Sequence, residues 1–334
     1  MDSSGQIQIT ATGAQATNAL HQVAFTGNLN LPGAIDLTLS DGRHLTSSIL
    51  GLSYLDTASG NSVWIGEVKD SFGLLLPSGS QALYPDAFTG CTADVLYENS
   101  IARFDQLVVL REQLPSPSEW GLDPATTVLQ VITEFFSGVE PAISQAVVAG
   151  ALDEALDFGP MQMVRGVAFG IGSEVNTVPV TKRWRLLDSR QCLVEEVPLA
   201  AIAPLMIDLA PAPPHVGGLP ASPDSPLYRV ASTPQLPPRK TSLPDSPALQ
   251  LAGAQPERKG LALDYTLVSN QSNMVFEADK TYYLSTAVNL IGTTVIEGGS
   301  VIKVTNRSDA GITLAGPLVC KTGAVPHGCN HFQG

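Results

Sequence analysis

The densest group of side chains that could do chemistry lies near the end of the sequence. Cys320, His327, Cys329 and His331 fall within twelve residues, and thiolate and imidazole groups are the ligands of tetrahedral zinc sites. The last three are spaced two residues apart, so on an extended chain they point the same way, with little loop to surround a metal. The spacing also matches no standard zinc pattern. We therefore interpret the cluster as accidental and predict no metal site.

A second candidate is the loop at residues 55–60 (LDTASG), which is similar to the Asp-Thr-Gly loop of aspartic proteases. Those enzymes share one proton between two carboxylates. Here the glycine is displaced and no second such loop exists, so we predict a turn between strands. The sequence also lacks G-x-S-x-G, HExxH, P-loop, EF-hand and strand-linked GxGxxG patterns. We predict no catalytic residue and no cofactor, and we expect His21 and His44, beside polar turns, at the surface.

The composition limits the possible partners. Net charge is −13, with 18 Lys plus Arg against 31 Asp plus Glu, and the densest basic cluster is residues 182–185 (KRWR). We predict that this cluster is a strand with outward arginines and an inward tryptophan, and that the protein binds no nucleic acid. No apolar run approaches the ~20 residues that a membrane span requires. Cys91 and Cys192 could pair in space, and the sequence leaves that question open, as it does the oligomeric state.

The elements that position these residues are mostly β. Residues 1–200 alternate polar and apolar side chains between Asp-Gly and Ser-Gly turns, a pattern typical of an antiparallel β-sandwich. We predict strands at residues 161–169, 178–186 and 192–197. One helix is predicted over residues 142–158, where Ile143, Val147, Leu152 and Leu156 recur at helical spacing before Gly159 and Pro160.

The middle of the chain changes character. Fourteen of the 25 prolines lie between residues 198 and 256. Because proline cannot complete the hydrogen-bond ladder of a sheet, residues 201–258 are predicted to form an extended linker. A short apolar helix over residues 199–209 is expected to dock on the preceding domain. The alternative is that the proline-rich segment wraps around that domain as an ordered strap.

Short apolar strands return after the linker. Residues 259–322 repeat apolar pairs every six to ten residues between Gly, Asn and Thr, with strands expected near 282–284, 288–290, 294–296, 301–304 and 312–314. This spacing favours the first coils of a parallel β-helix. A meander of ordinary hairpins is the alternative.

Six segments go beyond a strand pattern: 63–70 (VWIGEVKD), 84–90 (YPDAFTG), 109–117 (VLREQLPSP), 190–198 (RQCLVEEVP), 280–284 (KTYYL) and 294–303 (TVIEGGSVIK). Together they resemble an uncharacterised family of large secreted bacterial proteins of the Verrucomicrobia type. The resemblance implies export, a β-rich front domain, a variable linker and a long C-terminal β-helix. It implies no function for individual residues. Because residues 1–10 do not resemble a signal peptide, we expect that signal upstream.

The family pattern does not continue through residues 323–334. Read in the neighbouring frame, one permitted back-translation of this tail is close to the family pattern, so we expect a frameshift near the Gly323 codon and a truncated β-helix. The expected function is a non-enzymatic extracellular or cell-surface structural or interaction module whose partner is a glycan or another surface protein. Two alternatives stay open: the N-terminal part of a polysaccharide-active β-helix enzyme, and a carbohydrate-binding sandwich with Trp64 and Trp120 as an aromatic platform.

Overall fold

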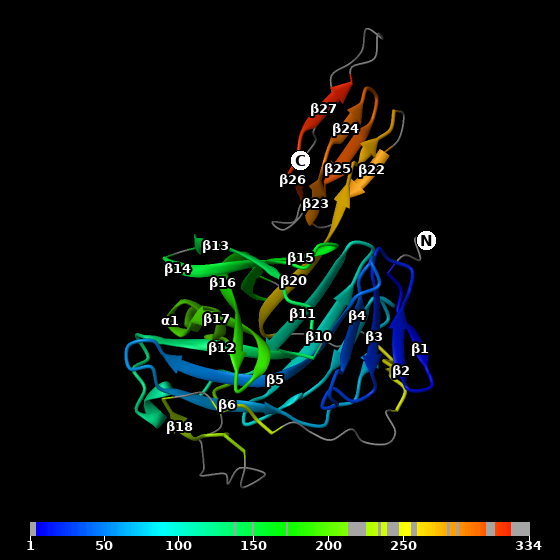
Figure 1. The fold of residues 1–334 in the computed structure, drawn as a ribbon. Helices are drawn as coiled ribbons and strands as arrows, with labels where there is room; N and C mark the ends of the chain where they lie inside the picture. Colours follow the sequence, from blue (N-terminus) through cyan, green and yellow to red (C-terminus); the bar gives the residue numbers. More distant parts are fainter. Residues whose placement is uncertain are drawn as a thin grey trace.

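A computed structural model describes residues 5–136, 138–148, 150–171, 173–212, 225–232, 235–238, 247–254, 259–278, 281–284, 287–304 and 311–321. These residues are mainly β, with one short α-helix, as the alternation of side chains predicted (Figure 1). Most strands belong to one large, mostly antiparallel sheet that folds over into two layers.

The first layer is built around the long strand β5. Its strands pair in the order β1–β2–β3–β4–β5–β12–β17–β16. Strand β4 pairs with the first part of one edge of β5, and β6 pairs with the second part of the same edge. The short strand β9 (Phe88–Thr89) pairs antiparallel with the end of β6. The bounds are β1 (Gln8–Thr10), β2 (Gly13–Ala16), β3 (Gln22–Thr26), β4 (Ile35–Thr38), β5 (His44–Asp56), β6 (Ser62–Val68), β12 (Thr127–Phe135), β16 (Ser173–Leu187) and β17 (Arg190–Pro198).

The second layer has the order β7–β8–β10–β11–β20–β15–β14–β13. Strand β16 joins the two layers, because its first half pairs with β15 and its second half with β17. A 3-10 helix, η1 (Pro117–Trp120), precedes β12. The bounds are β7 (Leu74–Leu75), β8 (Gln81–Tyr84), β10 (Ala93–Asn99), β11 (Arg103–Leu110), β13 (Ala142–Val148), β14 (Ala151–Asp157), β15 (Met161–Gly170) and β20 (Leu261–Ser272).

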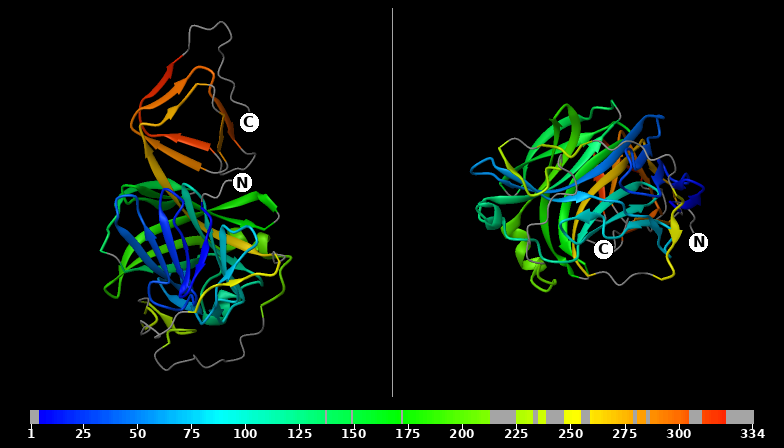
Figure 2. Two further views of the ribbon diagram at one scale, coloured as in Figure 1. Left: turned by 90° about the vertical axis from the view of Figure 1, so that its right-hand side faces the viewer. Right: turned by 90° about the horizontal axis from the view of Figure 1, so that it is seen from below.

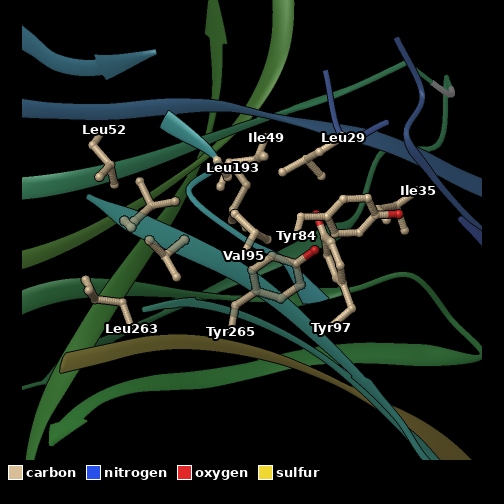
Figure 3. Close-up of a cluster of buried hydrophobic side chains, with 14 of the residues drawn as sticks. Leu29, Ile35, Ile49, Leu52, Tyr84, Val95, Tyr97, Leu193, Leu263 and Tyr265 are labelled. Atoms are coloured by element: carbon tan, nitrogen blue, oxygen red, sulfur yellow. The ribbon is translucent and has the colours of Figure 1, made fainter. Parts of the chain in front are cut away.

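The main core lies between the layers. Side chains alternate along each strand, so every second residue points inward. Leu52 and Leu193 from the first layer lie in one cluster with Tyr97, Tyr265 and Val95 from the second (Figure 3). The three strands predicted at residues 161–169, 178–186 and 192–197 are confirmed as parts of β15, β16 and β17.

The helix predicted over residues 142–158 is wrong. This segment is the antiparallel hairpin β13–β14, in which Val148 pairs with Ala151 across a two-residue loop. Gly150 in that loop has a φ of 83°, which glycine adopts without steric cost. Val147, which a helix would have buried, is 75% exposed. The helical spacing misled because residues four apart also share one face of a strand.

One predicted helix is confirmed. Helix α1 (Leu199–Ile202) continues as the 3-10 helix η2 (Ala203–Met206), within the range expected from sequence. Leu199, Ile202 and Met206 pack into the main core. Among the described residues, no helix combines the length and apolar composition needed to cross a membrane.

The described parts of the proline-rich segment lie on the front domain. We call residues 225–232 and 235–238 the strap. Within it, β18 (Val230–Ala231) pairs with β6, and the indole N–H of Trp64 donates to the carbonyl of Gln235 at 2.7 Å. Leu227 and Leu236 cover the outer face of the first layer. Further on, β19 (Gln250–Leu251) pairs in parallel with β7. These described residues therefore form an ordered strap on the front domain, which was the alternative prediction, and not an extended linker.

The last part of the chain is a stack of parallel strands, which we call the coil stack. Its strands pair in three short series, β20–β23–β26, β21–β24–β27 and β22–β25. Partners in the first and second coils are 19 or 20 residues apart, as in Val275 with Val295, and partners in the second and third coils are 24 apart, as in Ala287 with Gly311. The three series surround a common interior (Figure 2, left). The bounds are β21 (Val275–Phe276), β22 (Thr281–Leu284), β23 (Ala287–Ile291), β24 (Thr294–Glu297), β25 (Val301–Val304), β26 (Gly311–Leu314) and β27 (Leu318–Lys321).

Strand β20 belongs to both parts of the molecule. From Leu261 to Val268 it pairs antiparallel with β11, and from Asn270 to Ser272 it pairs in parallel with β23. The front domain therefore extends to about Val268, well beyond residue 200, where its end was expected. The apolar alternation of β20 ends at Val268 and residues 269–272 (SNQS) are all polar, so the pattern did not indicate that the strand continues into the coil stack.

Candidate functional site

A cavity of about 160 Å³ lies between the outer face of the first layer and the strap. Its floor comes from β5, β6, β12 and β17, and Ser225, Pro237 and Pro238 of the strap cover it. Its volume is similar to the ~150 Å³ of an engineered cavity that binds benzene. We call it the strap cavity. Three charged residues, Glu67, Glu134 and Arg190, line it together with apolar side chains.

Arg190 and Glu134 form a buried ion pair in the strap cavity. Glu134 lies opposite Cys192 in the β12–β17 register, so Arg190 is its diagonal neighbour on the same face. One guanidinium N–H of Arg190 donates to the Glu134 carboxylate, and another donates to the carbonyl of Pro237 at 2.7 Å. The arginine therefore connects the sheet to the strap. Its Nε has no hydrogen-bond partner.

Glu67 brings a second carboxylate to the strap cavity. It lies opposite Gly51 on one side of β5, whereas Glu134 lies opposite Ser48 on the other side. The register of β5 shifts in both pairings close to Gly51, which marks a β-bulge of the kind that re-aims side chains beside binding sites. The Ser225 hydroxyl of the strap donates to Glu67 Oε1 at 2.6 Å. The cavity thus combines one guanidinium and two carboxylates with apolar walls, a lining suited to a small molecule rich in hydroxyl groups.

A larger hollow of about 380 Å³ lies on the outer face of the second layer, beneath residues 251–254. Leu74, Leu83 and Val109 form much of its floor, and Arg111 pairs with Asp94 at 3.2 Å at its margin. The polar groups here are fewer and the ion pair is half-exposed, so the strap cavity is the better candidate for specific recognition.

Of the Cys/His cluster near the end of the sequence, the structure describes only one residue. Cys320 is exposed on β27, and His327, Cys329 and His331 lie outside the described residues. Across the part of the chain that the structure describes, no three His, Cys, Asp or Glu side chains are grouped so that they could hold a metal ion.

The protease-like loop at residues 55–60 is a turn between β5 and β6, as predicted. Asp56 accepts hydrogen bonds from the backbone N–H of Ala58 and from the hydroxyls of Ser59 and Thr126, at 3.0, 2.6 and 2.5 Å. These hydrogen bonds favour the charged carboxylate and lower the pKa of Asp56 to about 2. Asp56 therefore holds the turn in place and is unsuited to act as a general acid at neutral pH.

The two tryptophans considered as a glycan platform do not form one. Trp64 is 3% exposed and lies under the strap. Trp120 is half-buried, stacks on Tyr228 of the strap and meets Tyr54 edge-on. Because a platform needs an open ring face, neither residue can serve as the flat surface that the carbohydrate-binding alternative predicted.

His21 is buried, so its prediction as a surface residue is wrong. Its Nε2 lies 2.8 Å from Asn99 Oδ1, and burial lowers the pKa of the imidazole. His44 is exposed, as predicted. Cys91 and Cys192 are both buried and no disulfide joins them; Cys91 lies in the main core and Cys192 beneath the strap. Burial raises the pKa of Cys91 to about 12, so it is not a thiolate nucleophile at neutral pH.

Buried charges were the feature that the sequence did not reveal. In the segment 182–185, Trp184 points inward and the two arginines lie on the other face, as predicted, but Lys182 also points inward. On the outer face of the second layer, Arg103 pairs with Asp105, and Thr266 donates to the same carboxylate at 2.6 Å. Burial raises the pKa of Asp105 to about 6. Arg103 and Asp105 are only two residues apart, but no local signal marks them as buried, because Asp264 and Thr266, which contact them, are 161 residues further along the chain.

Comparison with known proteins adds no relative: no protein-family model, no curated protein and no solved structure matches the chain.

Proposed function

We propose that the protein is a non-enzymatic extracellular or cell-surface module in which a β-sandwich-like front domain presents the first coils of a parallel β-helix. The observation that carries the proposal is the continuity of β20, which runs from the centre of the second layer into the coil stack. A continuous strand without a free linker holds the two parts at a fixed angle. That arrangement suits display and does not require a reaction centre.

Contacts at the junction support this reading. The Asn289 side-chain amide of the coil stack donates to Gln162 Oε1 of β15 at 3.0 Å. The three parallel series, whose stacked strands recur every 19 to 24 residues, support the assignment as a parallel β-helix, in which each coil buries its inward side chains on the next. The net charge of −13 suits a soluble surface protein.

Surface labelling tests the location. In cells of the organism that encodes the chain, an epitope tag in the exposed loop at residues 40–43 should react with antibody on intact cells or appear in the medium. Externally added protease should remove it. A tag that reacts only after lysis would contradict the proposal.

Glycan binding is a second candidate function, favoured specifically by the strap cavity. Its guanidinium, two carboxylates and apolar walls match the alternating polar and apolar faces of a sugar ring. Binding of the full chain to a glycan array identifies a ligand, and Glu67→Gln should then weaken its affinity about 10- to 100-fold, since hydrogen bonds to charged groups contribute about 1.5–3 kcal/mol.

Asp86→Asn, in the exposed Lys69–Asp86 pair, neither of whose residues lines the cavity, is the matched control and should bind as the wild type does. Absence of any glycan ligand, or an unchanged affinity in Glu67→Gln, would exclude this second function. Shortened saccharides in the same incubation would instead favour the polysaccharide-active alternative.

A further inference from the structure

Three ionisable side chains meet inside the main core, away from the strap cavity. Lys182 lies on β16 between the inward residues Val180 and Trp184. Glu195 on β17 is its direct partner in the β16–β17 register, so both side chains leave the sheet on the same side. Asp153 reaches the pair from β14. We call these residues the Lys182 cluster.

The contacts within the cluster place an amine against a carboxyl group. Lys182 Nζ lies 3.2 Å from both Oδ1 and Oδ2 of Asp153. The backbone N–H of Lys182 also donates to Oδ1 at 2.9 Å. The side chains of Lys182 and Asp153 are only 2% and 8% exposed. A nucleophile, an electrophilic carbon and a hydrogen-bond donor on one carboxyl oxygen are thus held together out of water.

Glu195 supplies a group that can carry a proton. Burial raises the pKa of Glu195 to about 8, although the nearby charge of Lys182 opposes that rise. Glu195 is therefore mainly a neutral acid at pH 7, able to donate a hydrogen bond and to exchange a proton. Its surroundings include Tyr97 and Tyr265, two fully buried phenols of the main core (Figure 3).

A buried ion pair is a costly arrangement. Removing an ammonium and a carboxylate from water costs several kcal/mol each, which their attraction repays only in part. Transfer of one proton from Lys182 to Asp153 converts them into a neutral amine and a neutral acid, which a dry core tolerates better. Those two neutral groups are also the reactive forms for amide formation.

We propose that Lys182 and Asp153 join spontaneously in an intramolecular isopeptide bond, assisted by Glu195. The neutral Nζ attacks Cγ of Asp153 and forms the C–N bond. The developing charge rests on Oδ1, which the Lys182 backbone N–H stabilises. The carbonyl oxygen of neutral Glu195 accepts a proton from the nitrogen while its hydroxyl donates one to the Oδ2 hydroxyl, and the C–O bond breaks to release water. The ammonium and carboxylate become one amide and one water, and Glu195 ends as it began.

The bond would attach β14, which has few backbone pairings with the rest of the domain. Strand β14 pairs with β15 through only two residue pairs, Leu156 with Met163 and Asp157 with Gln162. Its contacts with β16 run through side chains, since Asp153 and Glu154 accept the backbone N–H groups of Lys182 and Trp184. A covalent bond between β14 and β16 would keep the exposed β13–β14 hairpin on the domain under force or protease attack.

Intact-mass spectrometry of the full chain under denaturing conditions tests the proposal. The wild type should weigh one water molecule less than its sequence, and digestion should give a branched peptide that joins the segments containing Asp153 and Lys182. Lys182→Arg should restore the sequence mass. Glu195→Gln should react at least about 100-fold more slowly, the usual contribution of a general acid–base group, and should also retain the sequence mass when freshly purified.

The exposed pair Lys69–Asp86, with Nζ 2.7 Å from Oδ2, is the matched control. Its peptides should be unlinked, and Lys69→Arg should keep the loss of one water. A wild-type protein that unfolds cooperatively and has its full sequence mass would overturn the proposal without any variant. A bond from Lys182 to Glu195 would overturn the choice of Asp153, and a linked Glu195→Gln would overturn the role of Glu195.

Discussion

Ionisable residues in this protein are buried on both sides of the first layer. Lys182 and Glu195 point into the main core, and Arg190 and Glu134 lie beneath the strap. Alternation along a strand indicates which residues share a face, but it does not reveal what covers that face. The turn at Asp56 could be predicted because all its signals are local. The strap cavity and the Lys182 cluster could not, because Glu134 and Arg190 are 56 residues apart and Asp153 and Lys182 are 29 apart.

His21 gives a prediction at the residue scale. Burial lowers the pKa of its imidazole in the folded state, so below about pH 6.5 the unfolded chain binds a proton that the folded chain does not. Stability from this residue is complete above pH 6.5 and is lost as the pH falls. His21→Gln should therefore reduce the loss of unfolding free energy between pH 7.5 and pH 5 by up to about 2 kcal/mol.

Urea unfolding of both proteins at the two pH values measures this effect. The difference between the proteins is the relevant quantity, because other groups titrate in the same range. Glu195, if it is free to titrate, has the opposite sign: its pKa is raised, so it favours the folded state at low pH and that contribution is lost as the pH rises toward 8. An equal pH dependence in wild type and His21→Gln would contradict the assignment.

At the scale of elements, strands with clear alternation were predictable and the hairpin β13–β14 was not. Its sequence carries apolar residues at spacings that both a helix and a strand permit. The choice is made by tertiary contacts, since Asp153 and Glu154 reach the backbone of β16 and Leu156 enters the main core. Prediction from sequence was limited in the same way for the proline-rich segment. Proline cannot complete the hydrogen-bond ladder of a sheet, but a proline-rich segment can still pack across the face of a sheet, as Leu227 and Leu236 do.

The strap gives a prediction at this scale. Trp64→Phe removes the indole N–H that donates to Gln235 and leaves that carbonyl without its partner, at a cost of about 1 kcal/mol. The strap should then open about five times more often, and limited proteolysis should cut it about five times faster. Tyr84→Phe also removes an aromatic donor to a backbone carbonyl, that of Thr26, but in the main core. It should lower global stability without a selective increase in strap cleavage, and equal strap cleavage in the two variants would contradict the prediction.

Among the described residues, the front domain and the coil stack bury their apolar side chains in separate clusters, and β20 runs from one part to the other. The main core lies between the two layers, and the coil stack has its own cluster of Phe276, Leu290, Ile296 and Ile302. The strands near residues 282–314 were predictable from short apolar pairs separated by Gly and Asn, and they occur where expected. Their partners were not predictable, because strand pairing in a stack depends on residues one coil away.

Separate cores predict separate unfolding. The coil-stack cluster is small and the outer strands β26 and β27 are largely exposed, so the coil stack should unfold at a lower temperature than the front domain. Ile302→Ala removes buried side-chain volume from that cluster and should destabilise it by about 2–4 kcal/mol, whereas Ile302→Val should cost about 1 kcal/mol. Calorimetry of the full chain should show two transitions, of which only the lower one moves. The upper transition should stay in place because β20 is anchored between β11 and β15 over its first eight residues. A single transition that shifts as a whole would mean that β20 couples the two cores into one cooperative unit.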